Sequence, residues 1–143
     1  MNVVYDKALD ALLTGGLGGS PVSGAGTLKA FLLDASLYTV DPTHQFLSSV
    51  PSGARIGSTV ALSGVTYTNG VFNCTSPVTF TAPPSGHTVN AWLIYISTGT
   101  DATSTLVAYI DTGYNLPLIT NGNDVKIQID SGANKIFALE SQG

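Results

Sequence analysis

Most of the chain alternates between apolar and polar residues with a period of two, or shows short apolar runs between turn residues. The clearest alternation is 124–130, where Val125, Ile127 and Ile129 face one way and Lys126 and Gln128 the other. Such a segment predicts a strand with one buried and one solvated face. By the same criteria the predicted strands are 27–33, 59–67, 71–74, 77–81, 88–97, 104–111, 124–130 and 134–139.

Three local features refine this picture. The run from Ala91 to Ile96 is apolar on both faces, which predicts a central strand covered on both sides. Asn69-Gly70 separates two predicted strands and is typical of a tight hairpin, because both residues tolerate positive φ. Residues 42–50 carry apolar side chains at helical spacing, which predicts one turn or a short helix ended by Pro51.

The first residues follow a helical period instead. Tyr5, Ala8, Leu9 and Leu12 share one face, so a short amphipathic helix is predicted from Val4 to Leu13. Residues 15–26 hold six glycines and are typical of a flexible tether. We therefore divide the chain into a helix with its Gly-rich tether (1–26) and a β domain (27–143).

We expect this helix to dock by its four apolar side chains on a neighbouring subunit or a larger shell, with docking on its own domain as the alternative. The β domain has a regular succession of short strands and no long helix. The predicted fold is mainly β, an antiparallel β-sandwich or a jelly-roll-like barrel.

The chain contains unusually few charged residues. Charged residues make up 10% of the chain and the net charge is -4, with the five cations scattered singly. No basic patch is present to neutralise phosphates, so nucleic acid is not an expected partner. A surface with so little charge suits a protein whose faces are covered by other subunits.

Other classes of protein are also disfavoured. Cys74 is the only cysteine, so no intrachain disulfide is expected. The chain does not open on a secretory signal pattern, and we expect folding in a reducing cytosol. No apolar run approaches the roughly 20 residues that span a bilayer, so no membrane partner is expected.

Candidate catalytic chemistry is sparse. His44 and His87 are the only histidines, and no Gly-x-Ser-x-Gly motif accompanies them. His87 follows a Pro-rich turn where exposure is expected, and His44 is expected to hydrogen-bond within its loop. Asp101 and Asp111 flank a predicted strand rather than converge, and no metal-ligand spacing is present. The sequence therefore predicts no catalytic residue, no cofactor and no metal site.

The aromatic residues offer one binding alternative. Trp92, Tyr95 and Tyr109 lie in strongly apolar strands and are expected in the core. Tyr38 and Tyr114 lie in predicted loops and are open to stacking on a sugar. A host-glycan-binding module is therefore a second hypothesis.

Several stretches of the chain carry a resemblance to a known family. The most specific is the string Thr43–Leu47 followed by Pro51–Arg55. The others are Tyr5–Leu9, Thr27–Asp34, Tyr38–Thr39 and Tyr95–Asp111. In these stretches the chain resembles a family of tailed-bacteriophage virion structural proteins. The resemblance covers most of the chain, and the Gly-rich stretch 15–26 is longer than the family's usual connection.

The resemblance implies a virion component, and the small β domain is similar to capsid decoration (cement) proteins. It implies no catalytic residue. The expected partners are the major capsid protein and further copies of the same chain, as a homo-oligomer that we expect to be a trimer. The expected location is the capsid exterior, after assembly in the host cytoplasm. The alternative is a tail, neck or fibre component.

Overall fold

In a computed structural model the chain is mainly β, and every strand pair in its described part is antiparallel. The structure describes residues 3–5, 27–62, 66–68, 71–73, 78–111, 116–127 and 137–138. The strands there are β1 (Val3–Val4), β2 (Thr27–Leu33), β3 (Arg55–Ala61), β4 (Thr66–Thr68), β5 (Val71–Asn73), β6 (Val78–Phe80), β7 (Thr88–Val89), β8 (Ala91–Ser97), β9 (Thr105–Ile110), β10 (Leu118–Ile119), β11 (Val125–Ile127) and β12 (Phe137–Ala138). Two 3₁₀ turns, η1 (Leu47–Ser49) and η2 (Ser52–Ala54), precede β3.

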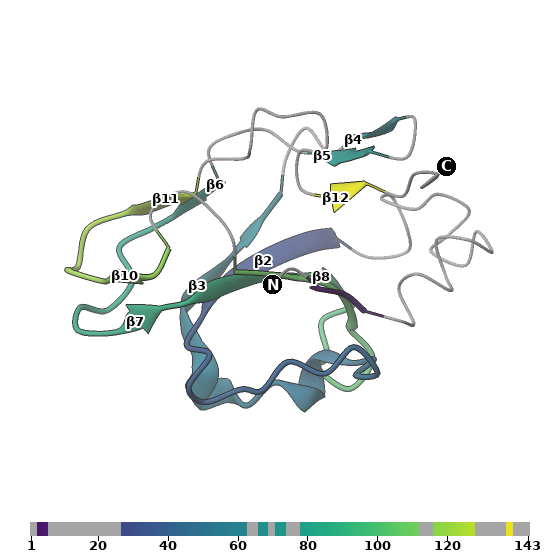
Figure 1. The fold of residues 1–143 in the computed structure, drawn as a ribbon, viewed down its shortest axis with the longest axis horizontal. Coiled ribbons are helices and arrows are strands. Elements are labelled where there is room, and N and C mark those ends of the chain that lie inside the picture. Colours follow the sequence, from purple (N-terminus) through teal and green to yellow (C-terminus); the bar gives the residue numbers. More distant parts are fainter. Residues whose placement is uncertain are drawn as a thin grey trace.

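A five-stranded sheet in the order β1-β9-β8-β2-β3 forms the centre of the molecule. Figure 1 shows it running across the middle of the view. The prediction of a central strand is confirmed in β8, where every residue from Ala91 to Ile96 is buried. β2 and β9 flank it, and pairs such as Leu32 with Trp92 fix the register. Continuous apolar runs are what a strand covered on both faces requires.

One face of this sheet packs under β6 and β11. In β11 the expected alternation is confirmed, since Val125 and Ile127 are buried while Lys126 is exposed. Their partners across the interface are the even-numbered side chains of β2 and β8. The buried cluster on this face contains Leu28, Ala30, Leu32, Ile56, Val78, Phe80, Val89, Trp92, Ile94, Ile96, Val107, Ala108, Ile110, Val125 and Ile127.

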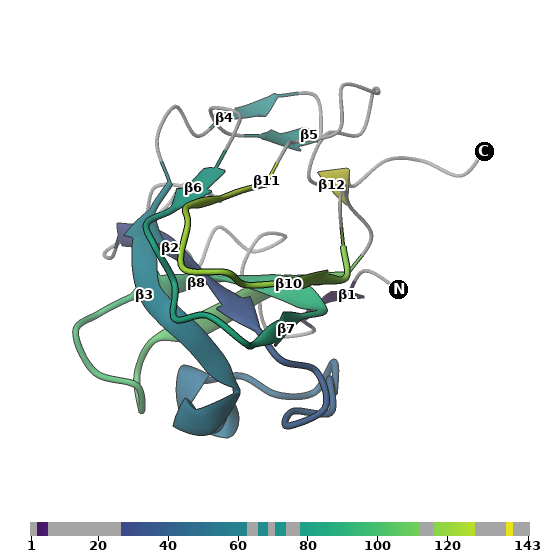
Figure 2. The same ribbon diagram turned by 90° about the vertical axis from the view of Figure 1, so that its left-hand side faces the viewer.

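The opposite face packs under the connection between β2 and β3. We call this connection, residues 34–54, the covering segment. Both ribbon views place it on the side of the sheet away from β6 and β11 (Figures 1 and 2). It contributes Tyr38, Leu47, Val50 and Ala54 to a second buried cluster, whose other members are Tyr5, Phe31, Leu33, Ala91, Leu93, Tyr95, Leu106 and Tyr109. The turn predicted before Pro51 is confirmed as η1.

Several predicted strand bounds need correction. The strand expected at 59–67 instead begins at Arg55 and ends at Ala61, because its backbone pairs with β2 from Leu33 back to Lys29. The single strand expected at 88–97 is split at Asn90 into β7 and β8, which belong to different sheets. β10, which pairs with β7, was not predicted.

The hairpin prediction is confirmed in its pairing. β4 and β5 are antiparallel with Thr68 opposite Val71, so two residues connect them. Those two residues, 69–70, lie outside the described part of the chain.

The predicted N-terminal helix is wrong at its first residue. Val3 and Val4 form β1, which pairs antiparallel with β9. Two β-branched residues favour a strand, and the open edge of β9 offers them backbone hydrogen bonds that an isolated short helix must supply by itself. Tyr5 continues the pairing, since its N–H donates to the Val107 carbonyl. Residues 6–26, with the remaining positions of the predicted helix and the tether, lie outside the described part.

Candidate functional site

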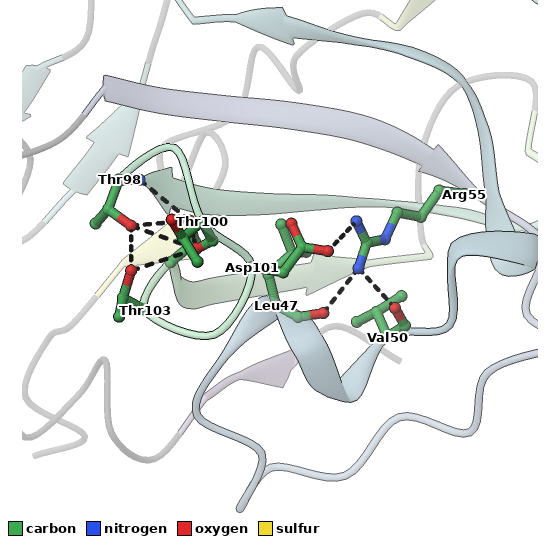
Figure 3. Close-up of polar contacts among 8 residues, drawn as sticks. Leu47, Val50, Arg55, Thr98, Thr100, Asp101 and Thr103 are labelled. Atoms are coloured by element: carbon green, nitrogen blue, oxygen red, sulfur yellow. Dashed lines mark hydrogen bonds and ion pairs between the residues drawn. The ribbon is translucent and has the colours of Figure 1, made fainter.

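We call the sheet face that packs under the covering segment the second face. Its polar side chains lie where the covering segment meets the sheet. Arg55 opens β3 opposite Leu33, so its side chain lies on the face that the covering segment covers. Its Nη2 donates to the carbonyl oxygens of Leu47 (3.0 Å) and Val50 (2.7 Å), at the two ends of η1. Its Nη1 forms an ion pair with an Asp101 carboxylate oxygen at 2.9 Å. Figure 3 shows the guanidinium between these three groups.

The surroundings of Arg55 make it part of the core. Its guanidinium carbon lies 5.8 Å from the centroid of the Phe31 ring, close enough for a cation–π contact. The Arg55 side chain is 18% exposed, whereas that of Asp101 is 56% exposed. The two hydrogen bonds to buried carbonyl oxygens therefore contribute most to holding Arg55 against η1. The ion pair contributes less, because water screens its exposed carboxylate.

Asp101 belongs to the β8–β9 loop, residues 98–104, which folds back against the covering segment. Its backbone carbonyl accepts from the Ser48 N–H at 3.2 Å, and the Ser104 carbonyl accepts from the Leu47 N–H at 2.9 Å. Inside the loop the Thr100 carbonyl accepts from the Ser104 hydroxyl at 2.8 Å. The hydroxyls of Thr98 and Thr103 also converge on that carbonyl (Figure 3). The loop is thus tied both to itself and to η1.

A second set of contacts joins the N-terminus to the covering segment. The hydroxyls of Tyr5 and Tyr38 lie 3.0 Å apart, and the Tyr38 hydroxyl lies 2.9 Å from His44 Nδ1. Tyr5 is fully buried and Tyr38 is 5% exposed. Burial raises the pKa of both phenols, because the charged form would lose its hydration. The two phenols therefore stay neutral, and the hydrogen bonds of this set hold β1 and the 38–44 loop together.

The predicted partner-binding residues fall into two groups. Ala8, Leu9, Leu12 and Tyr114 lie outside the described part of the chain. Tyr5 and Tyr38 are in the core of their own domain, so for Tyr5 the alternative of local docking describes this structure. The expectation that Tyr38 is open to a sugar is wrong, because its ring lies inside the second cluster.

The remaining candidates behave as the sequence suggests. His87 is exposed in the turn before β7, and His44 hydrogen-bonds within its loop. Asp101 and Asp111 stand on either side of β9 and do not converge. The Asp41 carboxylate accepts from the backbone and hydroxyl of Thr43, which lowers the pKa of that carboxyl.

Arg55 is the residue that sequence reasoning missed. In the sequence it is one of five scattered cations and the last residue of the Pro51–Arg55 string, and neither feature predicts a structural role for it. Its role depends on η1 and the β8–β9 loop coming together on one face, and no local pattern around Arg55 signals that meeting.

Within the described ranges, no group of three or more His, Cys, Asp or Glu side chains is placed to hold a metal ion. The described helices include none long and apolar enough to cross a membrane. No model of a known protein family matches the chain, and no curated protein sequence matches it.

Proposed function

We propose that this chain is a non-enzymatic structural protein of a tailed-bacteriophage virion. In this proposal it is a capsid decoration (cement) protein that binds the outer face of the major capsid protein shell and stabilises the head. Its location is the capsid exterior, and it reaches that location after assembly in the host cytoplasm.

The use of polar groups on the second face carries this proposal. The Arg55 side chain joins β3 to η1 and to Asp101 of the β8–β9 loop, and the Tyr38 hydroxyl joins the covering segment to Tyr5. The side-chain contacts of His44 and Ser104 hold their own loops in shape. Active sites, in contrast, aim such groups at a space where a substrate can enter. A domain whose polar groups hold its own segments together is suited to a structural role.

Two sequence features support the same function. The strings Thr43–Leu47 and Pro51–Arg55 resemble the virion family, and they form much of the covering segment and its anchor. The low content of charged residues, 10%, favours a protein whose surface is buried against other subunits.

The proposal extends to the architecture and the assembly. We take the five-stranded sheet with β6 and β11 as two layers of an antiparallel sandwich of the jelly-roll type. We expect the domain to act as a homo-oligomer, with three copies around a local threefold axis of the shell, because closed oligomers cover faces that a small domain leaves open.

The stoichiometry of the protein in purified particles tests the proposal. Quantitative mass spectrometry should find hundreds of copies per virion, and a cryo-electron microscopy map should place them on the capsid exterior. A few to a few dozen copies would place the protein in the tail, neck or fibres instead. A protein absent from purified particles would contradict any virion function.

A further inference from the structure

β1 occupies a short slot at the edge of β9. Val3 stands opposite Tyr109 and Val4 opposite Ala108, and the Tyr5 N–H donates to the Val107 carbonyl at 3.1 Å. Beyond that point the same edge of β9 is taken by the covering segment, since the Leu106 N–H donates to the carbonyl of residue 45. The slot therefore accepts three residues in extended conformation.

The Tyr5 side chain closes the slot. It is fully buried in the second cluster, and its hydroxyl contacts that of Tyr38. Backbone pairing along a strand edge combined with a pocket for one large side chain is how extended peptides are recognised by β-sheets. The slot thus holds a three-residue extended segment by its backbone and by the buried side chain of Tyr5.

The chain that leaves this slot is much longer than a local connection requires. Tyr5 is opposite Val107 and Thr27 is beside Ser97, so both ends of the connection lie at the end of the sheet where the β8–β9 loop turns. The sheet order places three strand spacings between β1 and β2, a distance of about 14 Å. The connecting residues are 6–26, twenty-one in number, and that length can span about 70 Å when fully extended.

We infer that the slot on β9 binds the N-terminal strand of a second copy of this chain when copies are close together. The N-terminal strand of another copy can make the same backbone and Tyr5 contacts as the chain's own strand. Which of the two fills the slot therefore depends on their effective concentrations near it. The effective concentration of the chain's own strand falls as the connection lengthens, while packing in a shell raises the concentration of neighbours. The inference deepens the proposed function and rests on it for that crowding.

Pairwise disulfide trapping tests the exchange. Val4 and Ala108 are directly opposite, and a cysteine at each position can bond across the two strands. One chain carries Val4→Cys and a second, larger tagged chain carries Ala108→Cys, both with Cys74→Ser so that no other thiol is present. After co-expression, purification and addition of an oxidant, we expect a reducible band that contains both chains.

The matched control replaces Ala108→Cys with Ser58→Cys, an exposed position on β3 at the opposite edge of the sheet. This pair should give no mixed band. The inference is overturned if Val4→Cys and Ala108→Cys form no mixed band, while one chain carrying both cysteines closes an internal bond.

Hydrogen exchange on the unmodified protein gives a second readout that needs no variant. Under strand exchange, protection of the Tyr5 amide should rise with protein concentration, while the Ile94 amide in the centre of the sheet should not change. Protection of Tyr5 that is the same at all concentrations, or a chain that stays monomeric at all of them, contradicts the inference. Copy number is measured on virions, so a capsid protein that keeps its own β1 would pass that test and fail this one.

Discussion

Arg55 illustrates how one charged side chain can hold a core together. Its guanidinium is mostly buried, stacks near Phe31 and donates to two carbonyl oxygens at the ends of η1. The Val50 carbonyl receives no other described hydrogen bond, whereas the Leu47 carbonyl also accepts from the Val50 N–H. Planar geometry with several fixed donors allows arginine to make these contacts at once, which a lysine ammonium matches poorly.

Replacing Arg55 should therefore weaken the whole domain. We expect Arg55→Met to lower the free energy of unfolding by about 2–4 kcal/mol, because the Val50 carbonyl loses its partner in a desolvated place. Arg55→Lys should fall between this variant and the wild type. Urea unfolding followed by circular dichroism measures the difference.

Asp101→Asn is the control for this experiment. It removes the ion pair and leaves the carbonyl contacts, so its cost should stay below about 1 kcal/mol because the carboxylate is largely exposed. Equal losses for Asp101→Asn and Arg55→Met would show that the ion pair, rather than the carbonyl contacts, fastens η1.

At the scale of elements, backbone conformation decides where the strands bend. β3 shifts register against β2 between Ala30 and Leu32, and Gly57 lies near this irregularity with φ +73°. A Cβ atom there would lie 3.1 Å from Pro83 Cβ, so the segment before β7 packs directly on the glycine. A residue without a side chain thus allows β3 to bend and be covered at the same place.

Three glycine-to-alanine variants separate these two effects. Gly53→Ala should be neutral or slightly stabilising, since its φ is not in the left-handed region and nothing lies near the new methyl group. Gly86→Ala adds only the left-handed backbone cost, because φ is +86° in open space; we expect a loss of about 1 kcal/mol. Gly57→Ala adds crowding against Pro83 and should lose the most.

Thermal and urea unfolding of the three variants measure this order. If Gly57→Ala is no worse than Gly86→Ala, the contact with Pro83 costs nothing and conformation alone selects glycine in β3.

At the scale of the whole molecule, one sheet is covered on both faces by different means. β6 and β11 cover one face with alternating apolar residues. The covering segment covers the other face with two 3₁₀ turns and packs there against buried phenols and Arg55. The buried tyrosine phenols of the core therefore lie on the second face. Its phenols Tyr5, Tyr38, Tyr95 and Tyr109 all have a raised pKa, chiefly because burial removes the water that would stabilise the charged form.

Stability should consequently fall at alkaline pH. Below about pH 10, the ordinary pKa of tyrosine, folded and unfolded chains both keep these protons and their contribution is constant. Above it the unfolded chain releases protons that the folded chain retains, so the free energy of unfolding decreases as pH rises. Urea unfolding between pH 8 and 11, a range that brackets that value, measures the decrease.

Tyr5→Phe is the informative variant for this effect. It removes one buried phenol and keeps the ring, so the decrease above pH 10 should be shallower than in the wild type. An identical slope in the two proteins would mean that Tyr5 ionises as easily in the folded chain as in the unfolded one.

The sequence alone determined the strands whose burial pattern is local. The apolar run in β8 and the alternation in β11 report which faces are covered, and the structure confirms both predictions. The Asn-Gly pair predicts a hairpin, and the antiparallel pairing of β4 with β5 confirms it. Such patterns depend only on neighbours a few residues apart, so they can be read without knowing the partner strand.

Tertiary structure alone decided which segments meet. β1 is a strand because the edge of β9 was open to it, and Tyr38 is buried because its loop lies on the second face. The strand expected at 88–97 divides because Thr88 and Val89 pair with β10, whereas β8 pairs with β2. Arg55 acquires its role only when η1 and the β8–β9 loop come together around it. These contacts join residues far apart in the chain, and their free energy outweighs the weak local preference that a sequence pattern records.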